Sequence, residues 1–91
     1  MSTKYSLAEH VVCRHTTADL RMLFDRRKGV MYELNETASA VVGTLESGTS
    51  TAEGLCDELL AEFDIAPEML RDDVIRLLED FREAGLLTVE E

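Results

Sequence analysis

Several residue types are scarce in this sequence, and each scarcity excludes a class of protein. There is no tryptophan, one proline and five glycines among 91 residues, so no stretch has the composition of a flexible linker. No apolar run approaches the roughly 18 residues of a membrane span, and the N-terminal residues lack the apolar stretch of a signal peptide. We therefore predict a single domain over residues 1–91, located in the cytoplasm and without a membrane partner.

Cysteine is also scarce, and the two present lack the spacing of a reactive pair. Cys13 and Cys56 are far apart without a CxxC motif, which predicts two small buried thiols. His10, Cys13 and His15 suggest a metal site, but strand alternation places His10 on the opposite face, and a closed zinc site needs a fourth ligand. Phosphate-loop, serine-nucleophile and Cys–His signatures are missing. We expect no metal, no cofactor and no enzyme activity.

Basic residues are few relative to acidic ones. Nine Lys and Arg against nineteen Asp and Glu give a net charge of −10, which opposes the counterion release that drives nucleic-acid binding. We therefore expect no DNA or RNA partner. Residues 1–35 carry six basic and four acidic side chains, whereas residues 36–91 carry three and fifteen, which indicates that two kinds of structure meet near Asn35.

The first part of the chain has the period-two alternation of half-buried strands. Three short strands are predicted, over about residues 10–14, 20–25 and 30–34. A turn over residues 16–19 joins the first two, and a longer loop over residues 25–29 joins the others, where Gly29 can take a positive φ. The residues expected on the apolar faces are Leu20, Met22 and Phe24 in the second strand, and Val30, Tyr32 and Leu34 in the third.

The rest of the chain has helical periodicity and clear start and stop signals. Asn35 caps a helix over residues 36–46, a capping box beginning at Ser50 opens a second over 51–63, and Pro67 opens a third over 67–84. The predicted buried stripes are Ala38, Val41, Val42 and Leu45; Leu55, Leu59, Leu60 and Phe63; and Leu70, Val74, Leu77, Leu78 and Phe81.

These elements predict an α+β, winged-helix-like fold in which a three-stranded antiparallel sheet is followed by three helices. Such a sheet cannot bury its apolar face alone, so the helices should pack against it. If the strands form a meander, the third is an edge, and its unpaired N–H and C=O groups are available to another chain. Only Glu33 protects this edge; the alternative is that Glu33 and a short strand are protection enough.

Four groups of residues, in order along residues 20–88, resemble the PqqD-like family. They are Leu23-Phe24-Asp25 followed by Gly29, Tyr32-Glu33-Leu34-Asn35 and Thr37-Ala38; Leu45-Glu46-Ser47-Gly48-Thr49; Phe63-Asp64-Ile65; and Asp73-Val74 followed by Leu77-Leu78 and Gly85-Leu86-Leu87. This family is known as the recognition element for ribosomally made, post-translationally modified peptides. The resemblance implies that a precursor's leader peptide adds as an antiparallel strand beside the third strand, in a groove against the third helix. A separate maturation enzyme then modifies the precursor: a radical SAM enzyme or, for lasso peptides, a leader protease with a cyclase.

The resemblance and the edge-strand argument together predict a peptide-binding site. Its residues are Val30, Met31, Tyr32, Glu33 and Leu34 in the docking strand, and Asp73, Arg76, Leu77 and Asp80 in the helical wall. Main-chain hydrogen bonds supply affinity in strand addition, and pockets for alternate side chains supply specificity. Three alternatives stay open: the charged helix residues form a solvated rim, Tyr32 and Leu77 are core residues, or Ile75 marks the contact face of the helix instead.

Two other classes remain as rivals. An acidic carrier-type protein, or a general protein-interaction domain, matches the size and charge, but the chain has no Asp-Ser-Leu to receive a phosphopantetheine arm. A winged-helix transcription factor needs a basic recognition helix, and none of the three predicted helices is basic. The basic turn Arg26-Arg27-Lys28 is either a solvated hairpin tip or a contact for an acidic partner or leader.

Overall fold

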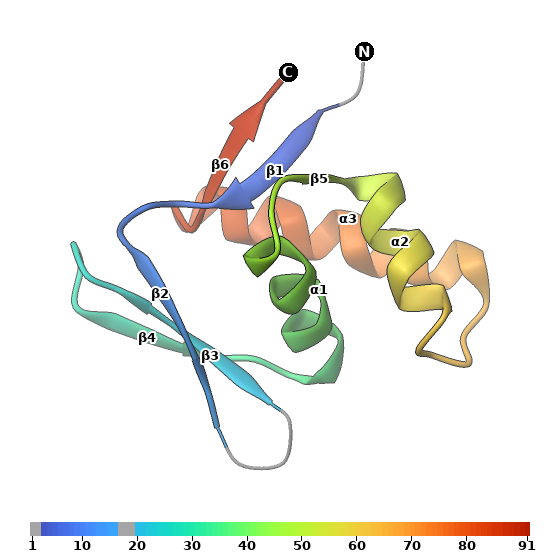
Figure 1. The fold of residues 1–91 in the computed structure, drawn as a ribbon, viewed down its shortest axis with the longest axis horizontal. Helices are drawn as coiled ribbons and strands as arrows, with labels where there is room; N and C mark the ends of the chain where they lie inside the picture. The colour runs from blue at the N-terminus through green and yellow to red at the C-terminus, as the bar shows by residue number, and fades with distance from the viewer. Residues whose placement is uncertain (1–2, 17–19) are drawn as a thin grey trace.

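A first antiparallel sheet is built from consecutive strands of the N-terminal part of the chain. The computed structural model describes residues 3–16 and 20–91, and this sheet contains β2 (Val11–His15), β3 (Arg21–Asp25) and β4 (Val30–Glu33) in the order β2-β3-β4 (Figure 1). The three strands match the predicted meander to within one residue at most ends. The β3–β4 turn ends at Gly29, whose φ of 68° confirms the predicted positive value. The predicted turn over 16–19 falls mainly on residues 17–19, outside the described residues.

A second small sheet was not predicted. It joins β1 (Lys4–Leu7), β5 (Ser50–Thr51) and β6 (Leu87–Glu90) in the order β5-β1-β6. Tyr5 lies opposite Val89, and Leu7 lies opposite Leu87. Each strand is too short to give a periodic signal, and its partners are distant in sequence, so only the folded chain reveals the pairing.

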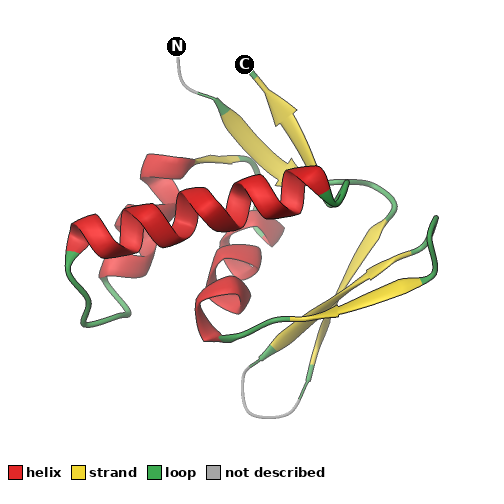
Figure 2. Ribbon diagram, turned by 180° about the vertical axis from the view of Figure 1, so that it is seen from behind, coloured by secondary structure: helices red, strands yellow, loops and turns green. Residues whose placement is uncertain are grey.

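Three helices complete the fold, each beginning close to its predicted cap. They are α1 (Glu36–Glu46), α2 (Ala52–Leu60) and α3 (Pro67–Glu83). The side chain of Asn35 accepts a hydrogen bond from the Ala38 N–H at 2.8 Å, and Pro67 occupies the first turn of α3, as predicted. In Figure 2, α3 crosses in front of α1, and the β2-β3-β4 sheet lies below its C-terminal end.

The second helix is shorter than predicted at both ends. Ser50 and Thr51 pair with β1, so the N-cap is Thr51, whose hydroxyl accepts from the Gly54 N–H at 3.0 Å. The helix ends at Leu60, and Phe63 packs half-buried beyond it. The prediction that Leu60 is buried is wrong: its side chain is 37% exposed because it lies on the outer flank of α2. Ala84, predicted as the last residue of the third helix, is instead the C-cap of α3.

The predicted apolar face of β3 is also wrong. Leu23 and Asp25 are the buried residues of this strand, and neither Met22 nor Phe24 belongs to a core cluster. Side chains alternate along a strand, so Met22 and Phe24 lie on the outer face of the sheet. The helices therefore cover the face of β3 that carries the buried Asp25 carboxylate, and the face of β3 with Met22 and Phe24 lies outside.

The core has two parts joined at the middle of the molecule. One cluster packs the first sheet against the C-terminal parts of the fold and contains Ala8, Val11, Leu23, Leu34, Ala38, Val42, Phe81 and Leu86. The other packs the three helices together and contains Val41, Leu45, Leu55, Leu59, Leu70, Val74 and Leu78. Leu7, Leu77 and Leu87 touch both clusters, so they connect the sheet half of the core to the helical half.

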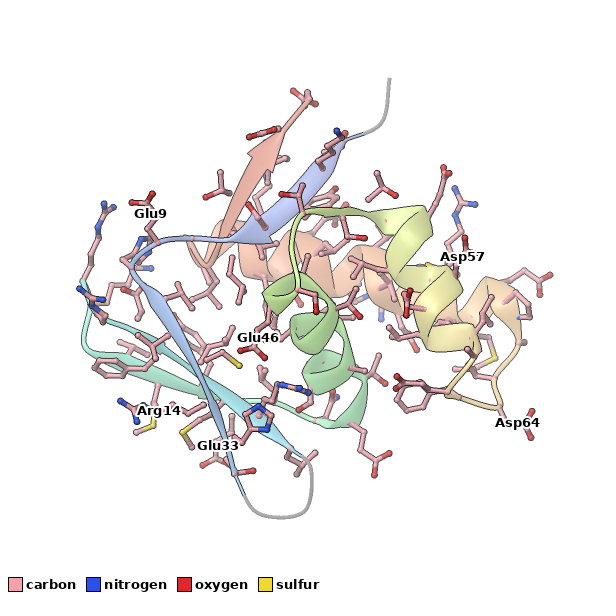
Figure 3. All side chains as sticks on the ribbon, viewed as in Figure 1. Glu9, Arg14, Glu33, Glu46, Asp57 and Asp64 are labelled. Carbon is pink, nitrogen blue, oxygen red and sulfur yellow. The ribbon has the colours of Figure 1, made fainter. Side chains whose placement is uncertain are left out.

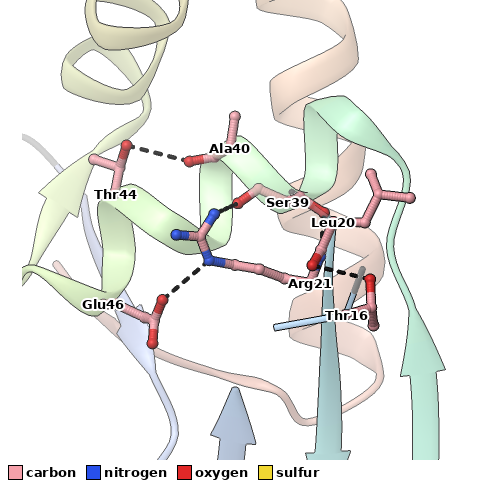
Figure 4. A network of polar contacts seen from close by, with 7 residues as sticks. All are labelled: Thr16, Leu20, Arg21, Ser39, Ala40, Thr44 and Glu46. Carbon is pink, nitrogen blue, oxygen red and sulfur yellow. Dashed lines mark hydrogen bonds and ion pairs between the residues drawn. The ribbon is translucent and has the colours of Figure 1, made fainter. Parts of the chain in front are cut away.

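A polar network ties β3 to α1 (Figure 4). The Arg21 N–H donates to the Ser39 hydroxyl at 2.9 Å, and its guanidinium donates to the Ser39 carbonyl at 3.2 Å and to Glu46 at 3.1 Å. Gly43 makes room for this guanidinium, since a Cβ there would lie 2.8 Å from Arg21 Nη1. The network fixes how the sheet sits against α1. In the described part of the chain, no helix has the length and apolarity needed to cross a membrane.

Candidate functional site

One long edge of β4 is left open. Within residues 3–16 and 20–91, β4 pairs only with β3, on one side. Within the same residues, no helix, loop or strand forms backbone hydrogen bonds to the other side of β4. An unpaired edge of this kind presents N–H and C=O groups that a further strand can use. The edge predicted from the sequence is therefore present.

Hydrogen bonding along β3 and β4 identifies which backbone groups face outward. The Leu34 N–H donates to the Arg21 carbonyl at 3.2 Å, so Leu34 points its backbone groups toward β3. The direction of the backbone N–H and C=O groups alternates along an antiparallel pair, so those of Tyr32, opposite Leu23, also point toward β3. The N–H and C=O groups of Met31 and Glu33 therefore point toward the open edge.

Tyr32 of β4 and Leu77 of α3 are the apolar residues predicted to line a groove between these two elements. Tyr32 is half-buried, and so is Leu77 of α3. Both pack against the core cluster that contains Leu34 and Phe81. Both predicted site residues thus pack on the same core cluster, and each keeps an accessible part. This arrangement supplies an apolar floor beside the open edge.

The charged residues predicted on α3 lie on or near the helix flank that carries Leu77. Asp73 and Asp80 come four residues before and three residues after Leu77, so all three share one flank of the helix. Both carboxylates and the Arg76 side chain are exposed. Met69, 61% exposed and four residues before Asp73, continues the same flank and was not predicted.

Ile75 lies on the other flank of α3 from Leu77. It lines a separate hollow of about 520 Å³ together with Tyr5 of β1 and Leu60 of α2. The sequence had left open whether Ile75 or Leu77 faces the docking strand. Leu77 packs against the core cluster that Tyr32 also contacts, and Ile75 does not.

The hairpin that carries β4 is fastened to the C-terminal end of α3. Lys28 Nζ donates to the Ala84 carbonyl at 2.8 Å, and His10 Nε2 lies 3.0 Å from the Gly85 carbonyl. Inside the turn, the fully buried Asp25 carboxylate accepts from the N–H groups of Arg27 and Lys28 at 2.9 and 3.1 Å. These contacts fasten the β3–β4 turn to the C-terminal end of α3.

Electrostatics around Asp25 favour its ionised form. Burial by itself raises the pKa of this carboxyl, but the N–H groups of Lys28 and Arg27 and the charges of His10 and Lys28 outweigh it and lower the pKa. Its second oxygen, Oδ2, faces His10 Nε2 at 3.8 Å and accepts no hydrogen bond from the described residues. Asp25 thus organises the hairpin turn as a charged acceptor.

The thiols are poor nucleophiles. Burial, followed by the charge and hydrogen bond of Glu46, raises the pKa of Cys13 to about 11. Burial also raises the pKa of Cys56. Since the thiolate is the reactive form, neither cysteine has the lowered pKa of a catalytic one. No group of three or more His, Cys, Asp or Glu with metal-binding geometry occurs among residues 3–16 and 20–91.

The remaining predicted strand residues divide into exposed and buried ones. Val30 and Met31 are 41% and 58% exposed, and Glu33 is exposed as well. Leu34 is buried and lies beyond the end of β4, so it supports the strand from the core. Sequence reasoning missed the roles of Lys28 and His10, because their partners lie on the distant end of α3.

Comparison with known proteins places the fold in a known group. Two solved structures match nearly the whole chain. TbiB1 in complex with the TbiA(beta) leader peptide has a TM-score of 0.82 and 23% identity, covering 90% of this chain and 93% of that one. Lasso peptide synthetase B1, complexed with the leader peptide, has a TM-score of 0.76 and 25% identity, covering 92% and 96%. These matches confirm the predicted winged-helix-like α+β fold.

Sequence comparison gives the family directly. No curated protein matches the chain. The family model described as coenzyme PQQ synthesis protein D (PqqD) matches residues 21–87, which include the whole of β3, β4 and the three helices. The match spans most of the sequence, with β4 and α3 included. The chain therefore belongs to the PqqD family.

Proposed function

We propose that this protein binds the leader segment of a precursor peptide and presents it to a separate maturation enzyme, without itself catalysing a reaction. The leader adds as an antiparallel strand to the open edge of β4, and its alternate side chains enter the groove against α3. The expected setting is the cytoplasm. The solved relatives that are complexed with leader peptides favour the lasso type, in which the enzyme is a leader protease with a cyclase.

The open edge of β4 beside an apolar floor carries this proposal. Met31 and Glu33 direct unpaired N–H and C=O groups outward, and the half-buried Tyr32 and Leu77 pack against the same core cluster. Main-chain hydrogen bonds to such an edge require only that the ligand be extended, so a leader without its own fold is a suitable ligand. The raised pKa of Cys13 leaves this thiol unsuited to nucleophilic chemistry.

An NMR titration with the synthetic leader of the precursor encoded beside this protein tests the proposal. We expect the amide signals of Met31 and Glu33 to move with the leader concentration and to become protected from exchange. The same sheet supplies an internal control, because β2 is its other edge and His15 also directs its N–H away from β3. Unchanged Met31 and Glu33 signals at saturating leader, or equal changes at His15, would contradict strand addition at β4.

A further inference from the structure

The outer face of the first sheet carries an ordered set of side chains that the groove does not use. Val12, Phe24 and Met31 lie side by side across the three strands, and Arg14, Met22 and Glu33 form the neighbouring row. Both rows face away from the helices, since none of their members belongs to a core cluster. Each row therefore ends at the open edge, in Met31 and in Glu33.

A strand added to β4 continues these rows by one residue each. Met31 and Glu33 direct their backbone groups outward, so the ligand residues opposite them form directly hydrogen-bonded pairs. Side chains in such pairs have Cβ atoms about 5 Å apart and contribute measurably to pairing. The ligand residue between them lies opposite Tyr32 and points into the groove instead. Two ligand side chains, two residues apart, are thus placed against Met31 and Glu33.

The chemistry of the two row ends differs. Met31 is 58% exposed and is backed by Phe24, which favours an apolar neighbour. Glu33 is exposed and forms no ion pair within the described ranges, where the pairs are His10 with Asp25 and Arg21 with Glu46. Arg14 lies at the far end of the same row, and its backbone is two strand spacings or about 10 Å from that of Glu33. Among the described residues no ion pair joins the two side chains, which are both labelled in Figure 3.

From this arrangement we propose that Glu33 and Met31 select the outward-facing residues of the leader: a Lys or Arg opposite Glu33 and an apolar residue opposite Met31. In an antiparallel leader, the basic residue precedes the apolar one by two positions, and the residue between them is the one read by Tyr32 and Leu77. This inference rests on the proposed function and adds to it a rule for the ligand. Glu33 is then a specificity residue as well as a charge that protects the edge.

The test is a charge-reversal scan. Synthetic leader variants carry Lys, Glu or Leu at each position of the bound segment, and fluorescence anisotropy measures their affinities for the wild type and for Glu33→Lys. We expect one position at which the wild type prefers Lys over Glu by about fivefold, with the order reversed for Glu33→Lys. Two positions farther on, both proteins should prefer Leu over Lys or Glu.

A matched control separates pairing from overall charge. Glu90→Lys makes the same charge change on an exposed residue of β6 in the other sheet, and should keep the wild-type order at every position. The rule is overturned if Glu33→Lys reverses the preference between Lys and Glu at no leader position, or if Glu90→Lys causes the same reversal. Either result would leave leader binding itself intact. If the wild type binds none of the leader peptides, the proposed function itself is refuted.

Discussion

Proline at position 31 is the most direct perturbation of the open edge. The Met31 N–H points away from β3, so Met31→Pro removes a donor that the folded protein does not use itself. Proline is compatible with an edge strand when its missing N–H faces solvent. The variant should therefore fold, and a circular dichroism melting curve close to that of the wild type checks this.

The expected loss of leader affinity follows from one hydrogen bond. Its net contribution is roughly 1 kcal/mol, and a leader carbonyl left unpaired in the interface costs about 1 kcal/mol more. The sum, about 2 kcal/mol, corresponds to a roughly thirtyfold higher Kd. Isothermal titration calorimetry with the leader peptide measures it. Met31→Ala keeps the N–H, so it should lose much less affinity.

A control variant at the opposite edge makes the result specific. His15→Pro removes an outward N–H from β2, and it should leave the affinity within about twofold of the wild type. A folded Met31→Pro protein that binds the leader as tightly as the wild type would refute the reasoning. Equal losses from Met31→Pro and His15→Pro would do so too, because they would show that the leader does not choose β4.

Three further predictions concern stability and reactivity. Because the pKa of Asp25 is lowered, the ionised carboxylate stabilises the fold above the ordinary pKa of 3.8, and this stabilisation is lost as the pH falls through the lowered pKa. Asp25→Asn should therefore flatten the acid side of a plot of Tm against pH. An unchanged slope would contradict the role of the carboxylate. Leu55→Ala should cost about 2–5 kcal/mol in urea unfolding, whereas Met69→Ala at an exposed site should stay within about 0.5 kcal/mol, and similar costs would mean that α2 is not packed as described. With a pKa of about 11 instead of 9.0, Cys13 should react with iodoacetamide about a hundredfold more slowly in the folded protein than in urea, as followed by mass spectrometry of its peptide; equal rates would contradict its burial.

Local signals in the sequence predicted most of the first sheet and the helices. Alternation and turn residues located β2, β3 and β4 to within about a residue, and Asn35 and Pro67 act locally as caps and helix starters, so neither depends on distant partners. The second sheet could not be predicted in the same way. Its strand β1 becomes a strand only because residues near the other end of the chain, and at the start of α2, lie beside it.

The wrong face of β3 has a specific physical cause. Met22 and Phe24 are more apolar than the alternate pair Leu23 and Asp25, so the usual rule places the first pair inside. Asp25 can be buried because two turn N–H groups and His10 surround its carboxylate. Those partners are assembled only in the folded hairpin, which is why the pattern of apolar residues alone pointed the wrong way.

Only part of the candidate site could be predicted from the sequence. That the third strand forms an edge followed from its place in a meander, and the i, i+4, i+7 spacing on α3 put Asp73, Leu77 and Asp80 on one flank. Which flank faces β4 depends on tertiary packing. Leu77 and Tyr32 share a core cluster, and Ile75 turns toward α2 and β1. The sequence could name both helix flanks but not choose between them.

The pairing of β1 with β6 has a practical consequence. Lys4 lies directly opposite Glu90, so the chain enters and leaves the domain at neighbouring points, while β4 lies at the other side of the molecule (Figure 1). A domain with adjacent ends can be spliced into a surface loop of another protein by two short joints, or circularly permuted by a short bridge between them. Either rearrangement would keep the open edge of β4 clear of the junction.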